Sequence, residues 1–325
     1  MKVLVTGASG FLGGWVAQKL SERGLEVRAL VRKSSKTTHL QTLKGVELAY
    51  GAIEDAGAVM HATDGVDAVI HSAGIVKGRN EADFMRTNVE GTKNLLDAAR
   101  GRNLKRFVHV SSLEAAGPSS DGAPVSIEQS APVTTYGRSK LAAEKLVLAE
   151  KDSIPLTVLR PGAIYGPRDQ EIFEAFKTVT RGLLPMVAGG RSLGSFIYGP
   201  DCAEACVAAL TAPAPSGAVF HIADNSGAVS QRQFLEMVEG ALGKKAFIRL
   251  NLPIGVLKTV SYGVKAFGTV TGRAVMLTPE KANMLMQHFV CSSQPAQSAL
   301  NWTPQVSLDE GLKHTVAWYR EHGWL

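Results

Sequence analysis

Three kinds of feature are scarce in this sequence of 325 residues, and each scarcity excludes a class of protein. Only three cysteines are present, none in a CxxC pair or beside histidines at zinc spacing, so we expect neither a disulfide framework nor a bound metal. No uninterrupted apolar run reaches about 18 residues, so we expect no membrane span. The sequence also lacks a block of basic residues: its formal net charge of +6 comes from scattered lysines and arginines, which argues against nucleic acid as a partner.

We also expect no secretory leader at the start of this sequence. The segment MKVLVTG turns at Gly7 before it can supply the apolar core of a signal peptide. We therefore expect a cytoplasmic protein in a reducing compartment, with its cysteines acting as small core residues. Apolar residues make up 45% of the chain and charged residues 20%, which is typical of a globular protein with a large core.

The first half of the chain alternates short apolar segments with helical patterns. Strands separated by helices of about 10–15 residues predict right-handed βαβ units and a parallel sheet that is covered on both faces. The expected fold class is therefore α/β, a doubly wound Rossmann sheet. We expect strands at 3–5, 26–31, 68–72, 107–111 and 156–159, and helices at 11–23, 88–100 and 136–151.

Two domains are expected, without a clear linker between them. Residues 1–160 form the Rossmann domain, and residues 161–325 form mainly a smaller cap. Part of the cap, about 195–225, returns to the sheet through a strand at 219–222. The segment 252–272 is amphipathic, so it could roof an apolar substrate, touch a membrane surface or be an ordinary core-facing helix. Further helices are expected at 172–181, 201–210 and 230–242, and from Thr278 onward.

A glycine-rich loop, GASGFLG, joins the first expected strand to the first expected helix. Gly7 permits a tight turn, Gly10 lets the backbone approach a pyrophosphate, and Gly13 lets the helix pack closely on the strand. The amino end of the helix then faces the anion with unpaired N–H groups. We therefore expect a nicotinamide dinucleotide to bind at this loop. The expected contacts are Thr6, Gly7, Ser9, Gly10, Phe11, Leu12 and Gly13.

The end of the second strand indicates which dinucleotide is bound. A carboxylate about 20 residues beyond the glycines would bind the ribose hydroxyls of NAD. This strand instead ends in LVRK, and its Arg32 has a planar guanidinium that suits a 2′-phosphate, with Lys33 and Lys36 adding charge. We therefore expect NADP as the preferred cofactor, with NAD as the second choice. The alternative is an exposed basic turn without a ligand.

A Tyr–Lys pair opens the helix expected at 136–151. Tyr136 and Lys140 are four residues apart and share one helical face. Tyrosine has a pKa of about 10, which a lysine ammonium and a cationic nicotinamide ring nearby would lower. Tyr136 could then exchange a proton with a ketone or alcohol while a hydride moves to or from the cofactor. The alternative is an ordinary surface pair, because YxxxK is common by chance.

Two serines follow the strand at 107–111. A hydroxyl at the carboxyl end of a parallel strand faces the ligand cleft, where it can orient a substrate oxygen toward Tyr136. We expect Ser112 to have this role, with Ser111 as the second choice. The alternative is a serine pair that caps its own backbone.

Together these motifs resemble the extended short-chain dehydrogenase/reductase family, which is similar to the NAD-dependent epimerases and dehydratases. The resemblance covers residues 1–170 in order, and it weakens toward ALNWTP near the C-terminus, which resembles the LGWxP segment of the family. The motifs that carry it are GASGFLG, HSAG at 71–74, TNVEGTKNLL with Asn88, VSS, YGRSK and RPGAIYGP at 160–167.

The resemblance implies a role for each matching residue. Ser112, Tyr136 and Lys140 would be the catalytic trio, with Asn88 supporting them. The chain after residue 160 would supply most of the substrate cap, and family members are often dimers through two helices, here 88–100 and 136–151. Further cofactor contacts would be Ala73 and Gly74 near the ribose, Tyr136 and Lys140, and Pro161 and Ile164 beside the nicotinamide.

The sequence departs from the family pattern at two places. An aspartate is common near the adenine where this chain has Ala52, and whether nearby Asp55 replaces it is open. Sugar-nucleotide epimerases and dehydratases usually have an asparagine where this chain has Ala163. The form RPGAIYGP is more similar to the branch of dihydroflavonol reductases and 3β-hydroxysteroid dehydrogenases. Arg191 and Arg273 could meet an anionic group of a substrate, although each is also a normal surface residue.

Three hypotheses of function follow. The first is an NAD(P)-dependent oxidoreductase that reduces a ketone or aldehyde, or oxidises a secondary alcohol, on a small molecule that could be apolar. The second is a nucleotide-sugar epimerase or dehydratase with tightly bound NAD. The third is a dinucleotide sensor without catalysis, since a fold does not fix a function.

Overall fold

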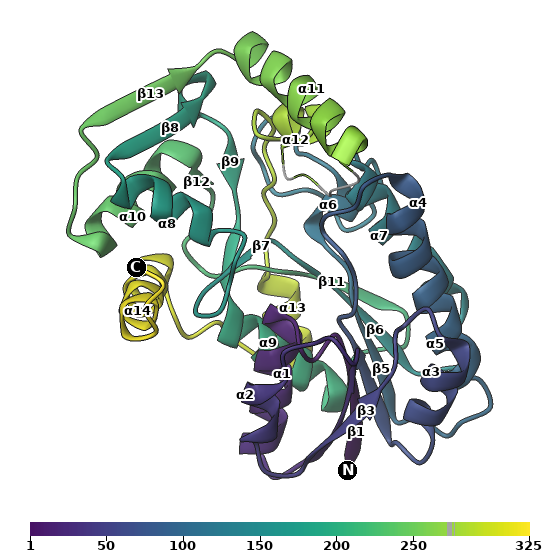
Figure 1. Cartoon of the computed structure of the whole chain (residues 1–325). Helices are drawn as coiled ribbons and strands as arrows, with labels where there is room; N and C mark the ends of the chain where they lie inside the picture. Colours follow the sequence, from purple (N-terminus) through teal and green to yellow (C-terminus); the bar gives the residue numbers. More distant parts are fainter. Residues whose placement is uncertain (272–274, 276) are drawn as a thin grey trace.

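The chain is built around a parallel sheet of seven strands (Figure 1). The computed structural model describes residues 1–271, 275 and 277–325, with only the backbone of residues 269 and 270. The doubly wound α/β fold expected from the sequence is confirmed. In order across the sheet, the strands are β11 (Ala218–Ile222), β6 (Leu156–Pro161), β5 (Arg106–Val110), β4 (Ala68–His71), β1 (Lys2–Thr6), β2 (Glu26–Val31) and β3 (Val46–Tyr50).

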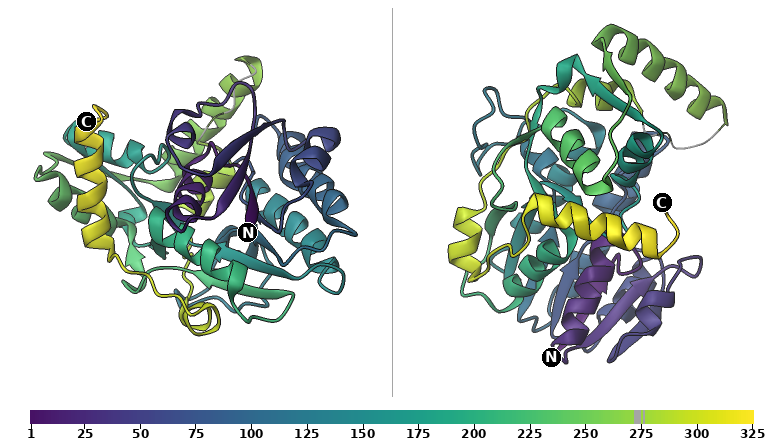
Figure 2. Two further views of the ribbon diagram at one scale, coloured as in Figure 1. Left: turned by 90° about the horizontal axis from the view of Figure 1, so that it is seen from below. Right: turned by 90° about the vertical axis from the view of Figure 1, so that its left-hand side faces the viewer.

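Helices cover both faces of this sheet (Figures 1 and 2). On one face, α1 (Phe11–Glu22), α9 (Gly199–Thr211) and α13 (Gln294–Leu300) pack over a core that includes Val3, Val5 and Val108. On the other face, α3 (Ala56–Thr63), α5 (Gly91–Ala99) and α7 (Thr135–Ala149) pack over a core with Leu4, Val69 and Phe107. Because both faces are buried, the sequences of the strands are nearly continuous apolar runs.

The strand order reverses between β1 and β4, which pair on one side while β2 pairs with β1 on the other. Ligands of doubly wound sheets bind beyond the carboxyl ends of the strands at such a point. Short elements leave these ends and surround the reversal point. They are α2 (Thr38–Gln41), α4 (Glu81–Phe84), the π-helical turn η1 (Met85–Glu90) and α6 (Leu113–Ala116).

A smaller layer with its own core lies beside the sheet, at the upper left of Figure 1. Tyr165, Phe176, Leu184, Leu312 and Tyr319 form the centre of this core. Two short parallel strands and three helices enclose it, namely β8 (Leu183–Val187), β13 (Ile248–Leu252), α8 (Phe173–Thr180), α10 (Gln231–Leu242) and α14 (Leu308–Glu321). Minor elements link the layers: β7 (Ala163–Tyr165), η2 (Ala188–Gly190), β9 (Leu193–Gly194), β10 (Phe196–Tyr198) and β12 (Val229–Ser230).

Two further helices, α11 (Ile254–Thr271) and α12 (Pro279–Met284), lie at the top of Figure 1. Leu257 of α11 is buried against Val187 and Ala282. Gly272, the last residue of the amphipathic segment 252–272, lies outside the described residues, as does Arg273. Among the described residues, no helix combines the length and hydropathy needed to cross a bilayer.

The structure adds elements that the sequence analysis does not assign and adjusts others. β3 is an edge strand of the sheet, and α3 packs against one face of the sheet. The added helix α14 begins with a capping box of Ser307 and Glu310. The helix expected at 88–100 begins earlier, as η1, and becomes α-helical only at Gly91. β11 lies beside β6, where a strand at 219–222 was expected. The division of the chain at residue 160 stays a prediction.

A buried ion pair joins α7 to the sheet. The guanidinium of Arg160 on β6 donates to both carboxylate oxygens of Glu144, at 3.0 and 2.5 Å. The two side chains are only 3% and 1% exposed. Arg160 also donates to the carbonyls of Ile127 and Gln129, at 2.8 and 3.3 Å. One side chain therefore fixes a strand, a helix and the loop that crosses above them.

Removal of one partner of this pair should be costly. Because Arg160→Met leaves the Glu144 carboxylate buried and unpaired, we expect the free energy of unfolding to fall by about 3–5 kcal/mol in urea denaturation. The control Lys313→Met breaks an exposed pair with Asp309 and should change stability by less than about 0.5 kcal/mol. A double variant, Arg160→Met with Glu144→Leu, should recover most of the loss. Equal effects of Arg160→Met and Lys313→Met would contradict this account.

Candidate active site

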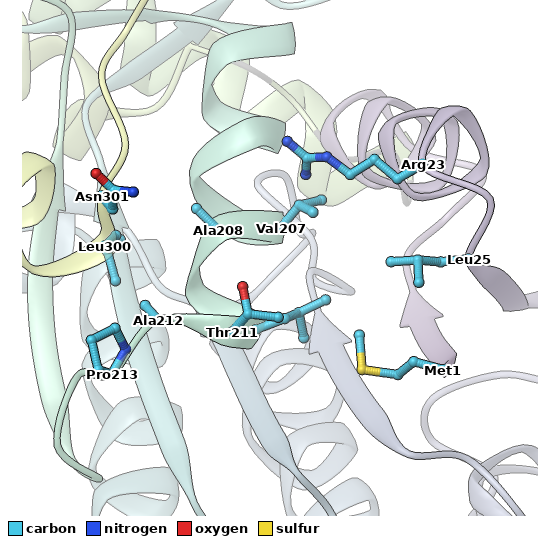
Figure 3. A pocket seen from close by; sticks show the side chains of 11 residues that line it. Met1, Arg23, Leu25, Val207, Ala208, Thr211, Ala212, Pro213, Leu300 and Asn301 are labelled. Carbon is cyan, nitrogen blue, oxygen red and sulfur yellow. The ribbon is translucent and has the colours of Figure 1, made fainter.

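The polar residues identified in the sequence follow the carboxyl ends of the central strands. A cavity of about 340 Å³ lies at the opposite edge, between Met1, Leu25 and the ends of α9 and α13 (Figure 3). The one charged side chain among the residues that line it, Arg23, is paired with Glu204. No other side chain that lines the cavity is charged, so the polar residues at the carboxyl edge are the candidate active site.

The glycine loop after β1 has no room for side chains. Gly7 has a φ of +71°, and a Cβ there would lie 2.8 Å from the Cα of Ala73. A Cβ on Gly13 would lie 2.2 Å from the carbonyl oxygen of Gly7, and one on Gly10 would lie 3.1 Å from the same atom. No side chain caps the amino end of α1, and its first turn has no acidic residue. The loop and helix end thus fit a pyrophosphate.

Thr6 connects this loop to the segment that follows β4. Its hydroxyl lies 2.7 Å from Nδ1 of His71 and accepts from the backbone N–H of Ala73 at 3.2 Å. The other ring nitrogen of His71 lies 2.8 Å from the hydroxyl of Thr92 on α5. Thr6 is fully buried. It therefore positions Ala73 and Gly74 beside the glycine loop, and its expected contact with the cofactor stays a prediction.

The turn after β2 lies beside the glycine loop. Ser9 donates a hydrogen bond to the hydroxyl of Ser35 at 3.1 Å, which joins the two loops. Arg32, Lys33 and Lys36 are all exposed. Within the described residues, Arg32 has no ion pair or side-chain hydrogen bond, so its guanidinium is available to a ligand at this edge.

Asp55 has a structural task. Its carboxylate caps α3 by accepting from the backbone N–H of Ala58 at 3.1 Å. It is exposed, and Ala52 is half-buried. The cap accounts for Asp55 without an adenine contact.

Tyr136 lies in the first turn of α7. Thr134 caps this helix by accepting from the N–H of Gly137 at 2.9 Å. The phenol ring of Tyr136 is half-buried and lies 6.5 Å from that of Phe84. Burial raises the pKa of the phenol, the carboxylate of Glu114 raises it further, and a hydrogen bond with Ser112 lowers it.

Lys140 lies one turn further along α7 and is buried. Its ammonium donates to the carbonyl of Val110 at 2.7 Å, at the end of β5. Burial lowers the pKa of Lys140 to about 8, and the carboxylate of Glu144 acts in the opposite direction. Since this ammonium is bonded to the backbone, the lowering of the tyrosine pKa by Lys140 together with a bound nicotinamide ring stays a prediction. A Cβ on Gly74 would lie 4.0 Å from this ammonium.

Asn88 fixes the loop beyond β4. Its side-chain oxygen accepts from the N–H of Ile75 at 2.8 Å, and its amide donates to the carbonyl of Ile75 at 3.1 Å. The same amide donates to the hydroxyl of Ser139 on α7 at 2.9 Å. Asn88 is 1% exposed, and these three hydrogen bonds join the loop to α7.

The two serines after β5 differ in their surroundings. Ser112 is half-buried, and its hydroxyl caps α6 by accepting from the N–H of Glu114 at 3.1 Å. The hydroxyl of Ser111 is buried and has no hydrogen-bond partner in the described residues. The contact of Ser112 with Tyr136 favours Ser112 as the residue that would orient a substrate.

The remaining cofactor candidates line the same edge. Pro161 ends β6 and is buried, while Ile164 is half-buried in β7 and pairs with Ile197. Phe11 and Leu12 form the first turn of α1, where a Cβ on Gly199 would lie 2.8 Å from the ring of Phe11. Leu12 is buried in the core, so only its backbone N–H is available to a ligand. Arg191 is exposed on the loop after η2.

Two residues that the sequence analysis missed come from α12. The ammonium of Lys281 pairs with Glu114 at 3.0 Å and lies 5.8 Å from the centre of the Tyr136 ring. The carboxylate of Glu280 accepts from the N–H and the hydroxyl of Thr135, at 2.7 and 2.8 Å. The sequence shows only a Thr-Pro-Glu helix start here, because contacts across more than 140 positions leave no local pattern.

The chain is similar to known proteins over nearly its whole length. The ceramide reductase of Caulobacter vibrioides is 31% identical over 99% of this chain and 96% of its own length. The 2-alkyl-3-oxoalkanoate reductase of Stenotrophomonas maltophilia is 30% identical over 98% of this chain and 99% of its own length. A structure of UDP-glucuronic acid 4-epimerase from Bacillus cereus with NAD has a TM-score of 0.79 at 24% identity, covering 99% of each chain.

A family model places the chain among these proteins. The model of the NAD dependent epimerase/dehydratase family matches residues 3–223, from β1 to the end of β11. This span contains the glycine loop, Asn88, the two serines, Tyr136 and Lys140. The chain therefore belongs to the NAD-dependent epimerase/dehydratase family, within the extended short-chain dehydrogenases and reductases.

Proposed function

We propose that this protein is an NADP(H)-dependent reductase of a ketone or aldehyde, which can also oxidise the corresponding secondary alcohol. The observation that carries the proposal is the convergence of Tyr136, Lys140 and Ser112 beside Gly74, at the edge that the glycine loop borders. Bound NADPH supplies a hydride to the carbonyl carbon. The residues of this chain supply the proton and the orientation.

The proton comes from the phenol of Tyr136. Ser112 donates a hydrogen bond to the carbonyl oxygen of the substrate, and Tyr136 transfers its proton to that oxygen as the carbon accepts the hydride. The oxygen thus becomes a hydroxyl, and Tyr136 is left as a phenolate. Lys140 stabilises this phenolate by its charge and binds the ribose, while Asn88 holds the loop and α7 in register. In the reverse direction Tyr136 accepts the proton.

The relatives support an apolar substrate. Two relatives at 30% identity or more, which span nearly the whole chain, are named a ceramide reductase and a 2-alkyl-3-oxoalkanoate reductase. A 32% identical relative from Stigmatella aurantiaca is named as a ketoreductase of a farnesyl quinoline oxide. We infer a carbonyl group attached to a long hydrocarbon chain as the substrate class. A cytoplasmic homodimer through η1–α5 and α7 completes the proposal.

A nucleotide-sugar epimerase or dehydratase is the second candidate. The family description and the fold shared with UDP-glucuronic acid 4-epimerase favour it. Ala163, where such enzymes usually have an asparagine, and the reductase names of the relatives weigh against it. NAD(H) released on denaturation of the purified protein would favour the epimerase. A sensor without catalysis would bind the cofactor and turn nothing over.

Replacement of Tyr136 by phenylalanine tests the proton donor. We expect Tyr136→Phe to lower kcat for 3-oxoacyl substrates by about 10²–10⁴-fold, because the hydroxyl proton is removed while the ring remains. NADPH binding, measured by fluorescence, should be unchanged. The control Tyr50→Phe alters an exposed tyrosine on β3 and should have no effect. Full turnover by Tyr136→Phe would overturn the proposed mechanism.

The pH dependence of kcat/KM tests Lys140. Its pKa of about 8 means that the ammonium is present below this pH and lost above it. Since the charged form supports Tyr136, kcat/KM should be level below about pH 8 and fall about tenfold per unit above it. Lys140→Arg, which keeps its charge, should move the fall to higher pH. An unchanged limb in Lys140→Arg would assign the titration to another group.

Arg32 tests the choice of cofactor. Loss of a charge-assisted contact with the 2′-phosphate in Arg32→Ala should raise the Kd for NADPH by about 10- to 100-fold and leave that for NADH unchanged. The matched control Arg181→Ala removes an exposed arginine at the end of α8. An equal rise of the Kd for NADPH and for NADH, or no rise of either, would contradict NADP preference.

A further inference from the structure

Exposed apolar side chains concentrate on one part of the cap. Twelve large apolar side chains are exposed in the described part of the chain, and seven of them lie between residues 247 and 267. Four are on α11, where Val256, Val260, Tyr262 and Phe267 are each at least 50% exposed. A soluble monomer seldom gathers such side chains on one element unless a partner covers them.

The exposed surface of α11 is organised around the helix axis. Val256, Val260 and Phe267 recur at spacings of four and seven, so they share one side. Lys258 and Lys265, seven apart, form a line along another side. The buried side, with Leu257 and Ser261, faces the protein. The exposed residues between the two lines are uncharged, namely Gly255, Thr259, Tyr262, Gly263 and Ala266.

The charge of this region has one sign. Between Glu239 and Glu280 the sequence has no acidic residue and six basic ones, while the whole chain has 29 acidic residues. Arg249 is paired with Glu236 and Glu239, and the other five basic residues are four lysines and Arg273. A helix with an apolar side, lysines on the opposite side and no acidic residue is complementary to an anionic lipid surface. A second copy of the chain is a poorer partner, because two such segments would repel each other.

The position of α11 leaves it accessible. It lies at the end of the molecule opposite the N-terminus, and it stands at the outer edge in the side view (Figures 1 and 2). Leu257 packs on α12 through Ala282, and Glu280 of α12 bonds to Thr135 on the helix of Tyr136. A surface bound at α11 would therefore be one helix away from the candidate active site.

We propose that α11 docks this protein on an anionic membrane surface, lying in the interface with Val256, Val260 and Phe267 among the lipid chains and Lys258 at the level of the phosphates. Docking does not depend on the proposed reaction, because it uses residues outside the catalytic group. The added benefit, access to an apolar substrate held in the membrane, does rest on the proposed function.

Vesicle flotation of the full chain tests the docking. With vesicles of phosphatidylcholine that contain about one third phosphatidylglycerol, the protein should float at least about tenfold more than with phosphatidylcholine alone. Val256→Ser with Phe267→Ser should lower flotation about tenfold or more. Lys258→Glu should lower only the preference for anionic vesicles, and about 1 M NaCl, with its screening length of about 3 Å, should do the same.

Matched controls separate docking from misfolding and from loss of activity. Tyr50→Ser with Met60→Ser removes two equally exposed apolar groups far from α11 and should float like the unchanged protein. All variants should retain NADPH binding and thermal stability, and Tyr136→Phe should float normally even if the proposed function is wrong. Equal flotation of the α11 and control variants would overturn the proposal. A dimer that the α11 substitutions dissociate, without vesicle binding, would assign this face to a second copy and also overturn it.

Discussion

The ion pair between Arg160 and Glu144 is the contact on which the arrangement of the candidate active site depends. Burial of two charges is unfavourable unless every polar atom finds a partner, and here the guanidinium also bonds to the carbonyls of Ile127 and Gln129. Glu144 is one helical turn from Lys140 and two from Tyr136. The pair therefore sets the rotation and height of α7 against β6, and with them the position of both side chains.

Residues of α12, in the expected substrate cap, hold the amino end of α7. Lys281 of α12 bonds to Glu114, and Glu280 bonds to Thr135, the residue before Tyr136. Glu114 raises the pKa of the phenol, and the ammonium of Lys281 beside it compensates part of that negative charge. Since α12 also carries α11, the segment proposed to contact the membrane, the proposed proton donor and the sheet form one continuous set of contacts.

The sequence predicted the parts of the molecule that are governed by local rules. The glycine spacing and the apolar strands predicted the Rossmann sheet, because a tight turn and a doubly covered strand impose a local pattern. The Tyr136–Lys140 spacing placed both residues on one face of α7. Their long-range partners were beyond reach: nothing near Asn88 indicates that it holds Ile75, and nothing near Lys281 indicates Glu114.

The same limit applies to Tyr136, whose lowered pKa beside a bound nicotinamide stays a prediction. The sequence shows that a lysine lies on the same face, but not that the carbonyl of Val110 engages its ammonium or that Glu114 approaches the phenol. Likewise, the sequence does not show that the hydroxyl of Thr6 lies against His71 and Ala73. Such assignments depend on which atoms are already bonded, and only the folded chain fixes them.

The central claim is that the cluster on α7 and β5 serves net hydride transfer to a carbonyl carbon. The most direct measurement follows deuterium from NADPH labelled at the nicotinamide C4 position into a 3-oxoacyl substrate, with the product analysed by mass spectrometry. The account predicts an alcohol that carries one deuterium on the carbinol carbon and an equal amount of NADP⁺. A product at the oxidation level of the substrate, with the label retained by the cofactor, would contradict it.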